Sequence, residues 1–295
     1  MPELPEVETV RRGLEPLIEG QRIVRVEQRR PDLRFPLPEN FAARLEGKTI
    51  TTLARRAKYL QMRLSSGETL VMHLGMTGRF TVSQTKSTAR TKPGNFTHEA
   101  GEHAKHDHVV FHLKSGTVVT YNDARRFGFM LLMSQDELET HPLFAHLGVE
   151  PFGNEFNADY LARRAAGKGV DLKAFLMDQR IVAGLGNIYV CEALHRAGLS
   201  PNRGAKSLAD RKGRPTDRAE RLVPAVKSVL TEALAAGGST LRDYRHANGE
   251  LGYFQHSFSV YGRTAKPCKK PGCRGIVRRS VSGGRSTFFC SACQK

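Results

Sequence analysis

The chain opens with a short apolar pattern of helical spacing. Apolar residues recur three or four positions apart, at Val7, Val10, Leu14 and Leu17. This spacing predicts a helix from Pro5 to about Ile18 that packs one face on a core. Pro5 suits the first turn of a helix, and Glu6 and Glu8 favour its positive end.

Between residues 23 and 133 the pattern changes to short segments of alternating character. These segments predict strands at 23–30, 58–64, 69–74, 109–113, 117–121 and 129–133. The second and third form a hairpin that turns at 65–68. One helix followed by many short antiparallel strands predicts a β-sandwich or barrel up to about residue 134. Residues 83–104 are polar and lack a period, so we expect a surface loop there.

Beyond residue 135 the helical period returns. It predicts helices at 136–146, 157–166, 171–178, 187–197, 217–236 and 240–246. Pro224 should start or kink its helix, and the polar segment 203–215 is expected to be a second loop. The predicted fold class is therefore α+β. We expect a catalytic β-sandwich domain at 1–134, a linker at 135–149, a helical domain at 150–260 and a cysteine-bearing module at 261–295.

The charge balance indicates the kind of partner. Over 295 residues, 46 Lys and Arg oppose 29 Asp and Glu, a net charge of +17. Such an excess favours a polyanion, either nucleic acid or an anionic membrane surface, although it could serve only solubility. The sequence shows no apolar run long enough to span a bilayer and no signal-peptide pattern at its start. We therefore expect a cytoplasmic, monomeric protein that binds nucleic acid and no membrane.

The first residues suggest nucleophilic chemistry. Met1 is followed by the small Pro2, and we hypothesise that Met1 is removed to leave a free N-terminal proline. An α-amine has a pKa of about 8, against about 10.4 for lysine, so more of it is neutral near pH 7. A secondary amine condenses with an aldehyde carbon to an iminium, and the adjacent Glu3 can move protons there. The alternative is a frayed chain end. The nucleophile hypothesis requires that this nitrogen be accessible.

Three basic or glycine-rich segments are further candidates. Lys58 follows two arginines at the head of a predicted strand, where a solvated basic face is the alternative to a phosphate-binding lysine. Met76 lies between two glycines, so it either packs in a core or projects as an apolar wedge of the kind that kinks DNA. The segment 122–128 places Arg125 and Phe127 on another turn.

Histidines and a helix start complete the polar candidates. His106 and His108 precede a strand and share one face, but a metal site would need a third ligand. Structural or phosphate-contacting roles suit them better. A tight glycine turn precedes Asn187 at the start of a predicted helix, where exposed N–H groups favour phosphate. Such turns are often only connectors.

The cysteines give the strongest signal that is independent of any family. Four of them form a C-x4-C-x16-C-x2-C pattern, at Cys268, Cys273, Cys290 and Cys293. Two such knuckles around a short hairpin suit one structural zinc ion, with disulfides as the alternative. The fifth, Cys191, falls on the apolar side of a predicted helix and is expected in the core.

Together these motifs resemble one family. The segments PELPEVETVRRGL, RRAKYL, HLGMTG, KHDH, RRFG, GLGNIY and VYGR and the cysteine module occur in the order found in bacterial formamidopyrimidine-DNA glycosylases. The resemblance covers nearly the whole chain. It implies a bifunctional glycosylase and abasic-site lyase that excises oxidised purines, 8-oxoguanine and formamidopyrimidines, from duplex DNA. It also implies that the helices on either side of the glycine turn before Asn187 form the arrangement called helix–two-turn–helix in this family.

The resemblance also implies residue roles. Pro2 would be the nucleophile and Glu3 its proton donor, with Lys58 assisting. Phosphate contacts would come from His73, His106, Asn187 and the hairpin-tip Arg285. Met76, Arg125 and Phe127 would fill the gap left by the extruded base, and the loop 238–253, with Arg242 and Tyr253, would close over that base. The chain departs from the family at Ala124, usually proline, and in its first knuckle, usually C-x2-C.

Two alternatives remain open from sequence. An endonuclease VIII-like enzyme would share Pro2 and Glu3 but prefer oxidised pyrimidines. A zinc-ribbon architectural protein would only bind and bend DNA, and replacement of Pro2 and Glu3 would then change nothing measurable.

Overall fold

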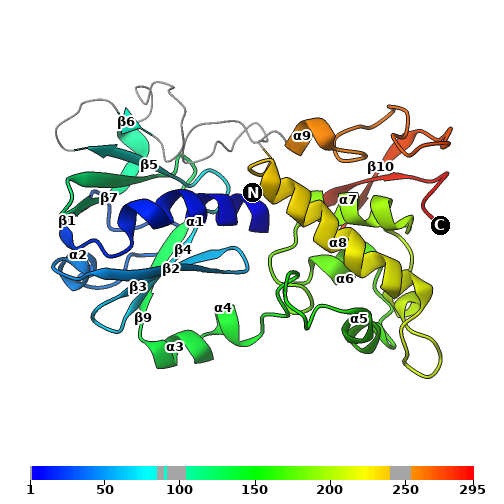
Figure 1. The fold of residues 1–295 in the computed structure, drawn as a ribbon, viewed down its shortest axis with the longest axis horizontal. Coiled ribbons are helices and arrows are strands. Elements are labelled where there is room, and N and C mark those ends of the chain that lie inside the picture. Colours follow the sequence, from blue (N-terminus) through cyan, green and yellow to red (C-terminus); the bar gives the residue numbers. More distant parts are fainter. Residues whose placement is uncertain (1, 85–89, 92–103, 240–253) are drawn as a thin grey trace. The chain divides into compact units, whose positions relative to one another are not determined.

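The chain forms two compact units. The computed structural model describes residues 2–84, 90–91, 104–239 and 254–295. The first unit comprises Met1–Ala145 and Ala236–Tyr253, and the second comprises His146–Ala235 and Phe254–Lys295. The elements of each are labelled in Figure 1.

Helix α1 (Leu4–Ile18) opens the first unit. Its apolar side chains are at most 1% exposed at Val7, Val10, Leu14 and Ile18, so the predicted packing face is confirmed. Glu8 is also buried and accepts hydrogen bonds from Arg11, Arg12 and Arg55. Burial opposes the ionisation of Glu8, but hydrogen bonds from the arginines outweigh it and lower the pKa of the carboxyl.

Two antiparallel sheets make up the body of the first unit. One has the order β1-β7-β8-β5-β6, from β1 (Ile23–Gln28), β5 (Arg79–Gln84), β6 (Arg90–Thr91), β7 (Asp107–Leu113) and β8 (Thr117–Asn122). The other has the order β2-β3-β4-β9, from β2 (Ile50–Arg56), β3 (Tyr59–Leu64), β4 (Thr69–His73) and β9 (Phe129–Met133). One apolar core takes side chains from both sheets, from α1 and from the short α2 (Phe41–Leu45), which confirms the sandwich.

Strands β2, β5 and β6 were missed by the sequence pattern, and the two residues of β6 lie within the segment 83–104 that was predicted to be a loop. In β2 the register shifts between Ile50 and Thr52, and only Ile50 and Leu53 of the strand are buried, so no period of two is visible. In β5 three consecutive residues, 80–82, are buried. The apolar Phe80 and Val82 flank the polar Thr81, so the alternation covers too few positions to stand out in the sequence.

The first unit ends in two short helices instead of the single one predicted at 136–146. Helix α3 (Gln135–Thr140) begins at Ser134, whose hydroxyl accepts the Glu137 N–H, and α4 (Pro142–Ala145) follows directly. The break lies at His141, which takes an extended conformation because the residue before a proline is disfavoured in helices.

The second unit is mainly helical. It contains α5 (Ala158–Ala165), α6 (Leu172–Met177), α7 (Asn187–Ala197), η2 (Ala205–Leu208), α8 (Asp217–Ala235), α9 (Phe254–Ser257) and the hairpin of β10 (Val277–Ser282) and β11 (Arg285–Cys290). This confirms the α+β class. Pro224 lies inside α8 and does not start it, whereas the helix predicted at 240–246 lies outside the described residues. Cys191 is buried, as expected.

No helix among the described residues has both the length and the apolar character needed to cross a membrane.

Candidate functional site

The N-terminal residues are fixed in the first unit and not frayed. Glu3 precedes α1 and is 3% exposed, and its backbone N–H donates to Glu6 Oε2 at 2.8 Å. The other oxygen of Glu6 accepts the backbone N–H and the hydroxyl of Ser239, at 2.8 and 2.9 Å. One buried carboxylate therefore holds the N-terminal dipeptide and joins it to the segment that follows α8.

Pro2 is buried as a residue in the chain that carries Met1. In a chain that carries Met1, the Pro2 nitrogen is a tertiary amide, whose lone pair is delocalised into the carbonyl. That form has no nucleophile at this position. Release of Met1 is thus a chemical precondition for any amine chemistry at Pro2.

A second set of contacts connects the basic turn to α1. Arg55 donates from Nε to Glu8 Oε2 at 3.0 Å and from Nη1 to the carbonyl oxygen of Ala57 at 2.9 Å. Ala57 has a positive φ of 52°, which lets β2 and β3 join through a two-residue turn formed with Lys58. Lys58 is 7% exposed, so it is not part of a solvated basic face.

His73, at the end of β4, is held as a neutral ring. Burial, together with the cations Lys58 and Arg34, lowers its pKa to about 4. Its Nδ1 accepts the Gly75 N–H at 3.0 Å, which leaves the proton on Nε2. The ring stacks on Phe129 with centroids 5.2 Å apart. His73 therefore offers a neutral Nε2–H donor whose orientation is fixed.

The two glycine-containing turns of the first unit pack directly on each other. A Cβ added at Gly75 would lie 2.3 Å from the backbone nitrogen of Gly128, so only glycine allows the contact. The fully buried Asp123 joins the turns through its carboxylate. Oδ1 accepts the Thr77 hydroxyl, while Oδ2 accepts the Gly128 N–H at 2.8 Å and the Tyr121 hydroxyl at 3.2 Å. Sequence reasoning missed Asp123, although it stands inside the NDARRFG motif.

These turns present the three predicted wedge residues. Phe127 is 45% exposed, and the Arg125 guanidinium lies over its ring at 4.7 Å from the centroid. Met76 is half-buried on the neighbouring turn. An exposed aromatic ring covered by a cation is suited to contact with bases.

The two histidines at the start of β7 differ in environment, because His106 precedes the strand and His108 lies in it. His106 ends the 3₁₀ helix η1 (Ala104–His106) and is half-buried, and its carbonyl oxygen accepts the Asp123 N–H at 3.0 Å. His108, in β7, is buried, with Nε2 2.8 Å from the Asp123 carbonyl oxygen. His108 thus has a structural partner.

In the second unit, α6 and α7 are joined by two tight turns. Gln179 supports both, donating from Nε2 to the carbonyl oxygens of Met177 and Leu185 and accepting the Gly184 N–H. Asn187 is the first residue of α7, and its Nδ2 donates to the Ser286 carbonyl oxygen at 3.0 Å. The helix start is thereby fixed against the C-terminal hairpin.

Arg285 begins β11 at the tip of that hairpin. Gly283 and Gly284 both have positive φ, at 55° and 72°, as a two-residue hairpin turn requires. The Arg285 side chain is exposed. Behind it, the buried Lys173 of α6 donates to the carbonyl oxygens of Arg285 and Ser286 and to Thr287 Oγ1, the last at 2.6 Å. Sequence reasoning missed Lys173, whose only signal was a lysine within an apolar helical segment.

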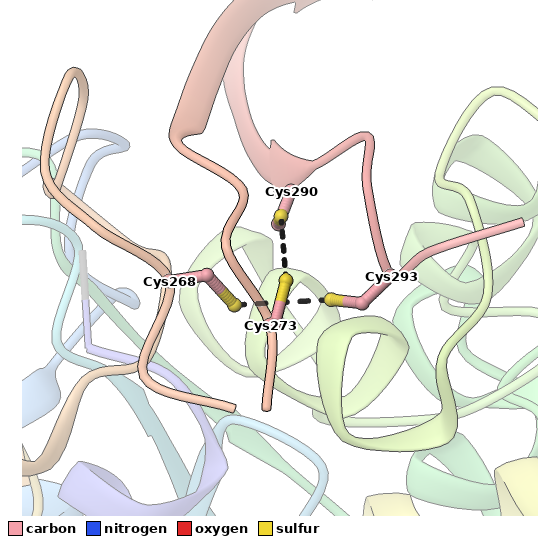
Figure 2. Close-up of side chains that lie close together, drawn as sticks. All are labelled: Cys268, Cys273, Cys290 and Cys293. Atoms are coloured by element: carbon pink, nitrogen blue, oxygen red, sulfur yellow. Dashed lines mark hydrogen bonds between the residues drawn. The ribbon is translucent and has the colours of Figure 1, made fainter. Parts of the chain in front are cut away.

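The four cysteines converge at the base of the same hairpin, with their side chains directed toward one another (Figure 2). Their sulfur atoms all lie within 4.8 Å of one another, with Cys268–Cys293 at 3.8 Å and Cys273–Cys290 at 3.7 Å. A tetrahedron with Zn–S bonds of about 2.3 Å places sulfurs about 3.8 Å apart. The donor set and its spacing therefore fit zinc, and four thiolates would leave no open position.

Two predicted residues, Arg242 and Tyr253, lie outside the described part of the chain.

The chain was compared with known proteins. A model of the formamidopyrimidine-DNA glycosylase N-terminal domain matches residues 1–130, and one of the H2TH domain of the same enzymes matches residues 147–245. The chain belongs to the formamidopyrimidine-DNA glycosylase family. It is 59% identical to the formamidopyrimidine-DNA glycosylases of Bradyrhizobium sp. (strain ORS 278) and Methylocella silvestris, over the full length of each chain.

Solved structures of the family agree. The crystal structure of the MutM (Fpg) protein from Thermus thermophilus matches with a TM-score of 0.80 at 40% identity, covering 99% of this chain and 98% of that one. The Lactococcus lactis Fpg in complex with DNA containing an abasic site matches with a TM-score of 0.82 at 32% identity, covering 99% of each chain. Membership of the formamidopyrimidine-DNA glycosylase family makes this chain a DNA-binding glycosylase of DNA repair, and the four-cysteine cluster fits its zinc.

Proposed function

We propose that this glycosylase excises oxidised purines from duplex DNA through Pro2 and then cleaves the abasic site by β- and δ-elimination. The observation that carries the proposal is the fixed position of the N-terminal dipeptide. Glu3 and Glu6 are 3% and 2% exposed, and Glu6 binds both Glu3 and Ser239. A frayed chain end would not require two buried carboxylates there, because burying a charge is costly unless it is paired.

The base-release step follows from amine chemistry. After loss of Met1, the neutral Pro2 nitrogen attacks C1′ of the damaged nucleotide, and the bond to the base breaks with the electron pair leaving on the base. The attacking nitrogen gives up its proton to the departing base and Glu3 protonates the ring oxygen, so that the sugar opens as the freed nitrogen lone pair forms the iminium. Because a secondary amine has no second proton to lose, this iminium stays charged.

Strand cleavage uses the same intermediate. The positive nitrogen makes the C2′ protons acidic, so removal of one expels the 3′ phosphate, and a further elimination expels the 5′ phosphate. Hydrolysis of the iminium then releases Pro2. We assign Lys58 to the phosphate or sugar beside this reaction.

The remaining residues would bind and distort the DNA. The excess of cations gives salt-dependent attraction to the phosphates. His73, His106, Asn187 and Arg285 would contact phosphate, while Met76, Arg125 and Phe127 would fill the position of the extruded nucleotide. We place Arg242 and Tyr253 at the extruded base. Zinc bound by the four cysteines would stabilise the hairpin that carries Arg285 and take no part in the reaction.

The substrate class rests on the relatives. Those named above are formamidopyrimidine-DNA glycosylases, and the Lactococcus lactis Fpg has been solved with DNA containing Fapy-dG as well as an abasic site. A ring-opened purine is therefore the first substrate to test.

The decisive experiment is borohydride trapping on a duplex that contains 8-oxoguanine or formamidopyrimidine. Mass spectrometry first establishes that Met1 is absent. We expect a covalent protein–DNA adduct whose peptide map places the sugar on Pro2. Glu3→Gln, which keeps the shape but not the acid, should bind DNA and release base at least ~10²-fold more slowly, whereas the exposed Glu39→Gln serves as the matched control.

Three results would refute the proposal. An adduct on Lys58 would reassign the nucleophile, and preference for oxidised pyrimidines in a lesion panel would reassign the substrate. Unchanged behaviour of Glu3→Gln together with DNA bending but no cleavage would favour a purely architectural role.

A further inference from the structure

Helix α7 of the second unit contributes a side chain to the cysteine cluster from outside the C-terminal module. His195 lies in the last turn of α7 and is 5% exposed. Its Nε2 is 3.2 Å from Cys268 Sγ, within hydrogen-bonding distance for sulfur. A histidine 73 positions away in the chain thus touches the first cysteine of the cluster.

The direction of this hydrogen bond follows from the state of the sulfur. A metal-bound cysteine is a thiolate and has no proton to donate, so it can only accept. Nε2 must therefore carry the proton and donate it. Because four thiolates outnumber the two charges of a zinc ion, the cluster is anionic, and a half-buried anionic site is stabilised by N–H groups directed at its sulfurs.

Cys268 needs such a donor because of its unusual knuckle. The first pair of cysteines is separated by four residues, including Pro271, which has no N–H, and Gly272, which has a φ of 74°. Within this knuckle the Lys270 N–H reaches Cys268 Sγ at 3.4 Å, a longer contact than that of His195.

The second knuckle also binds the end of α7, but here the side chain belongs to the module. Gln294, 3% exposed, accepts the Cys290 N–H at 2.8 Å and donates to the carbonyl oxygen of Leu199, just beyond α7, at 2.8 Å. Gln294 of the module therefore binds the backbone at the end of α7, and His195 at the end of α7 contacts the module. Each knuckle has its own attachment to α7, whose first residue is Asn187.

We propose that His195 is an outer-sphere ligand of the zinc site, donating its Nε2–H to the Cys268 thiolate and so positioning the longer first knuckle on α7. It touches no substrate and is a positioning residue. The inference depends on zinc in the four-cysteine cluster but not on the glycosylase reaction.

Zinc affinity tests the proposal directly. The zinc content of the wild-type protein is measured first, and competition with the chromogenic chelator 4-(2-pyridylazo)resorcinol then gives relative affinities. Loss of an outer-sphere partner typically weakens metal binding about 10- to 100-fold. We expect at least a tenfold loss for His195→Phe, which keeps the bulk but not the N–H, and substantial recovery for His195→Gln, whose amide can donate. The exposed His146→Phe is the matched control and should bind zinc like the wild type.

A second measurement needs no variant. In protein loaded with ¹¹³Cd, the His195 Nε2 proton should be visible by NMR and should couple to the metal through Cys268. Absence of a proton on Nε2, or of this coupling, overturns the proposal, as does wild-type zinc affinity in a folded His195→Phe. A wild-type protein without zinc would refute the cofactor assignment and this inference with it, while leaving base excision by Pro2 to be judged by trapping.

Discussion

Replacement of Asp123 by asparagine should loosen the two turns that carry the wedge residues. The carboxylate accepts from three donors, namely the Thr77 hydroxyl, the Gly128 N–H and the Tyr121 hydroxyl. Asparagine has the same shape but offers one oxygen and an NH₂ group that only donates. With the amide oxygen turned toward Gly128 and Tyr121, the Thr77 hydroxyl faces the NH₂ group and loses its acceptor, and the two other donors lose a charged one.

The size of the effect can be worked from these contacts. A buried donor left without a partner costs about 1–3 kcal/mol, and hydrogen bonds to a charged acceptor contribute about 1.5–3 kcal/mol each. The hydroxyls can rotate, so we expect one clear loss and a net destabilisation of about 2–4 kcal/mol. The exposed Asp136→Asn is the control and should change stability by less than about 0.5 kcal/mol.

Two assays separate local loosening from global unfolding. Urea denaturation followed by far-UV circular dichroism gives the stability, and hydrogen–deuterium exchange locates the change. Exchange should accelerate in peptides that cover 74–80 and 121–129 but not in α7 or α8 of the second unit. A variant with wild-type stability and unchanged exchange in both turns would refute the assigned role of Asp123.

Two further changes have defined expectations. Ala124 is the second residue of a turn in which the Arg126 N–H donates to the Asp123 carbonyl oxygen, and proline is favoured at that position. Ala124→Pro should therefore stabilise the fold by about 0.4–1 kcal/mol, measured as a raised Tm. A lowered Tm would contradict this assignment of the turn. His73 has a folded pKa of about 4 against an ordinary value near 6.5, so the folded state resists protonation, and stability is lost as pH falls from 6.5 toward 4. Between pH 7.5 and 5 its contribution should fall by about 2 kcal/mol. In urea titrations over this range His73→Gln should therefore lose about 2 kcal/mol less stability than the wild type, and equal losses in the two proteins would contradict the prediction.

Much of the architecture was predictable from local patterns. The face of α1, the hairpin of β3 and β4, and helices α5 to α8 all follow from the spacing of apolar residues, because their apolar positions recur with the period of a helix or of a strand. The cysteine pattern likewise indicated one site, since only a few ligand spacings allow four thiols to meet. Strand β2 was not predicted because its register shift interrupts the alternation of apolar and polar residues on which a strand prediction depends.

What the sequence could not supply was the set of partners that meet across long separations in the chain. Pro2 and Glu3 could be proposed as reactive from their chemistry, but their attachment to Ser239 through Glu6 arises only when residues 233 positions apart are folded together. The same holds for Lys173 behind Arg285 and for His195 beside Cys268. Periodicity and composition record which side chains are apolar and how often they recur, and these determined the elements. Which buried donor faces which acceptor is decided by packing, because that is set by the geometry of the whole unit and leaves no local trace in the sequence.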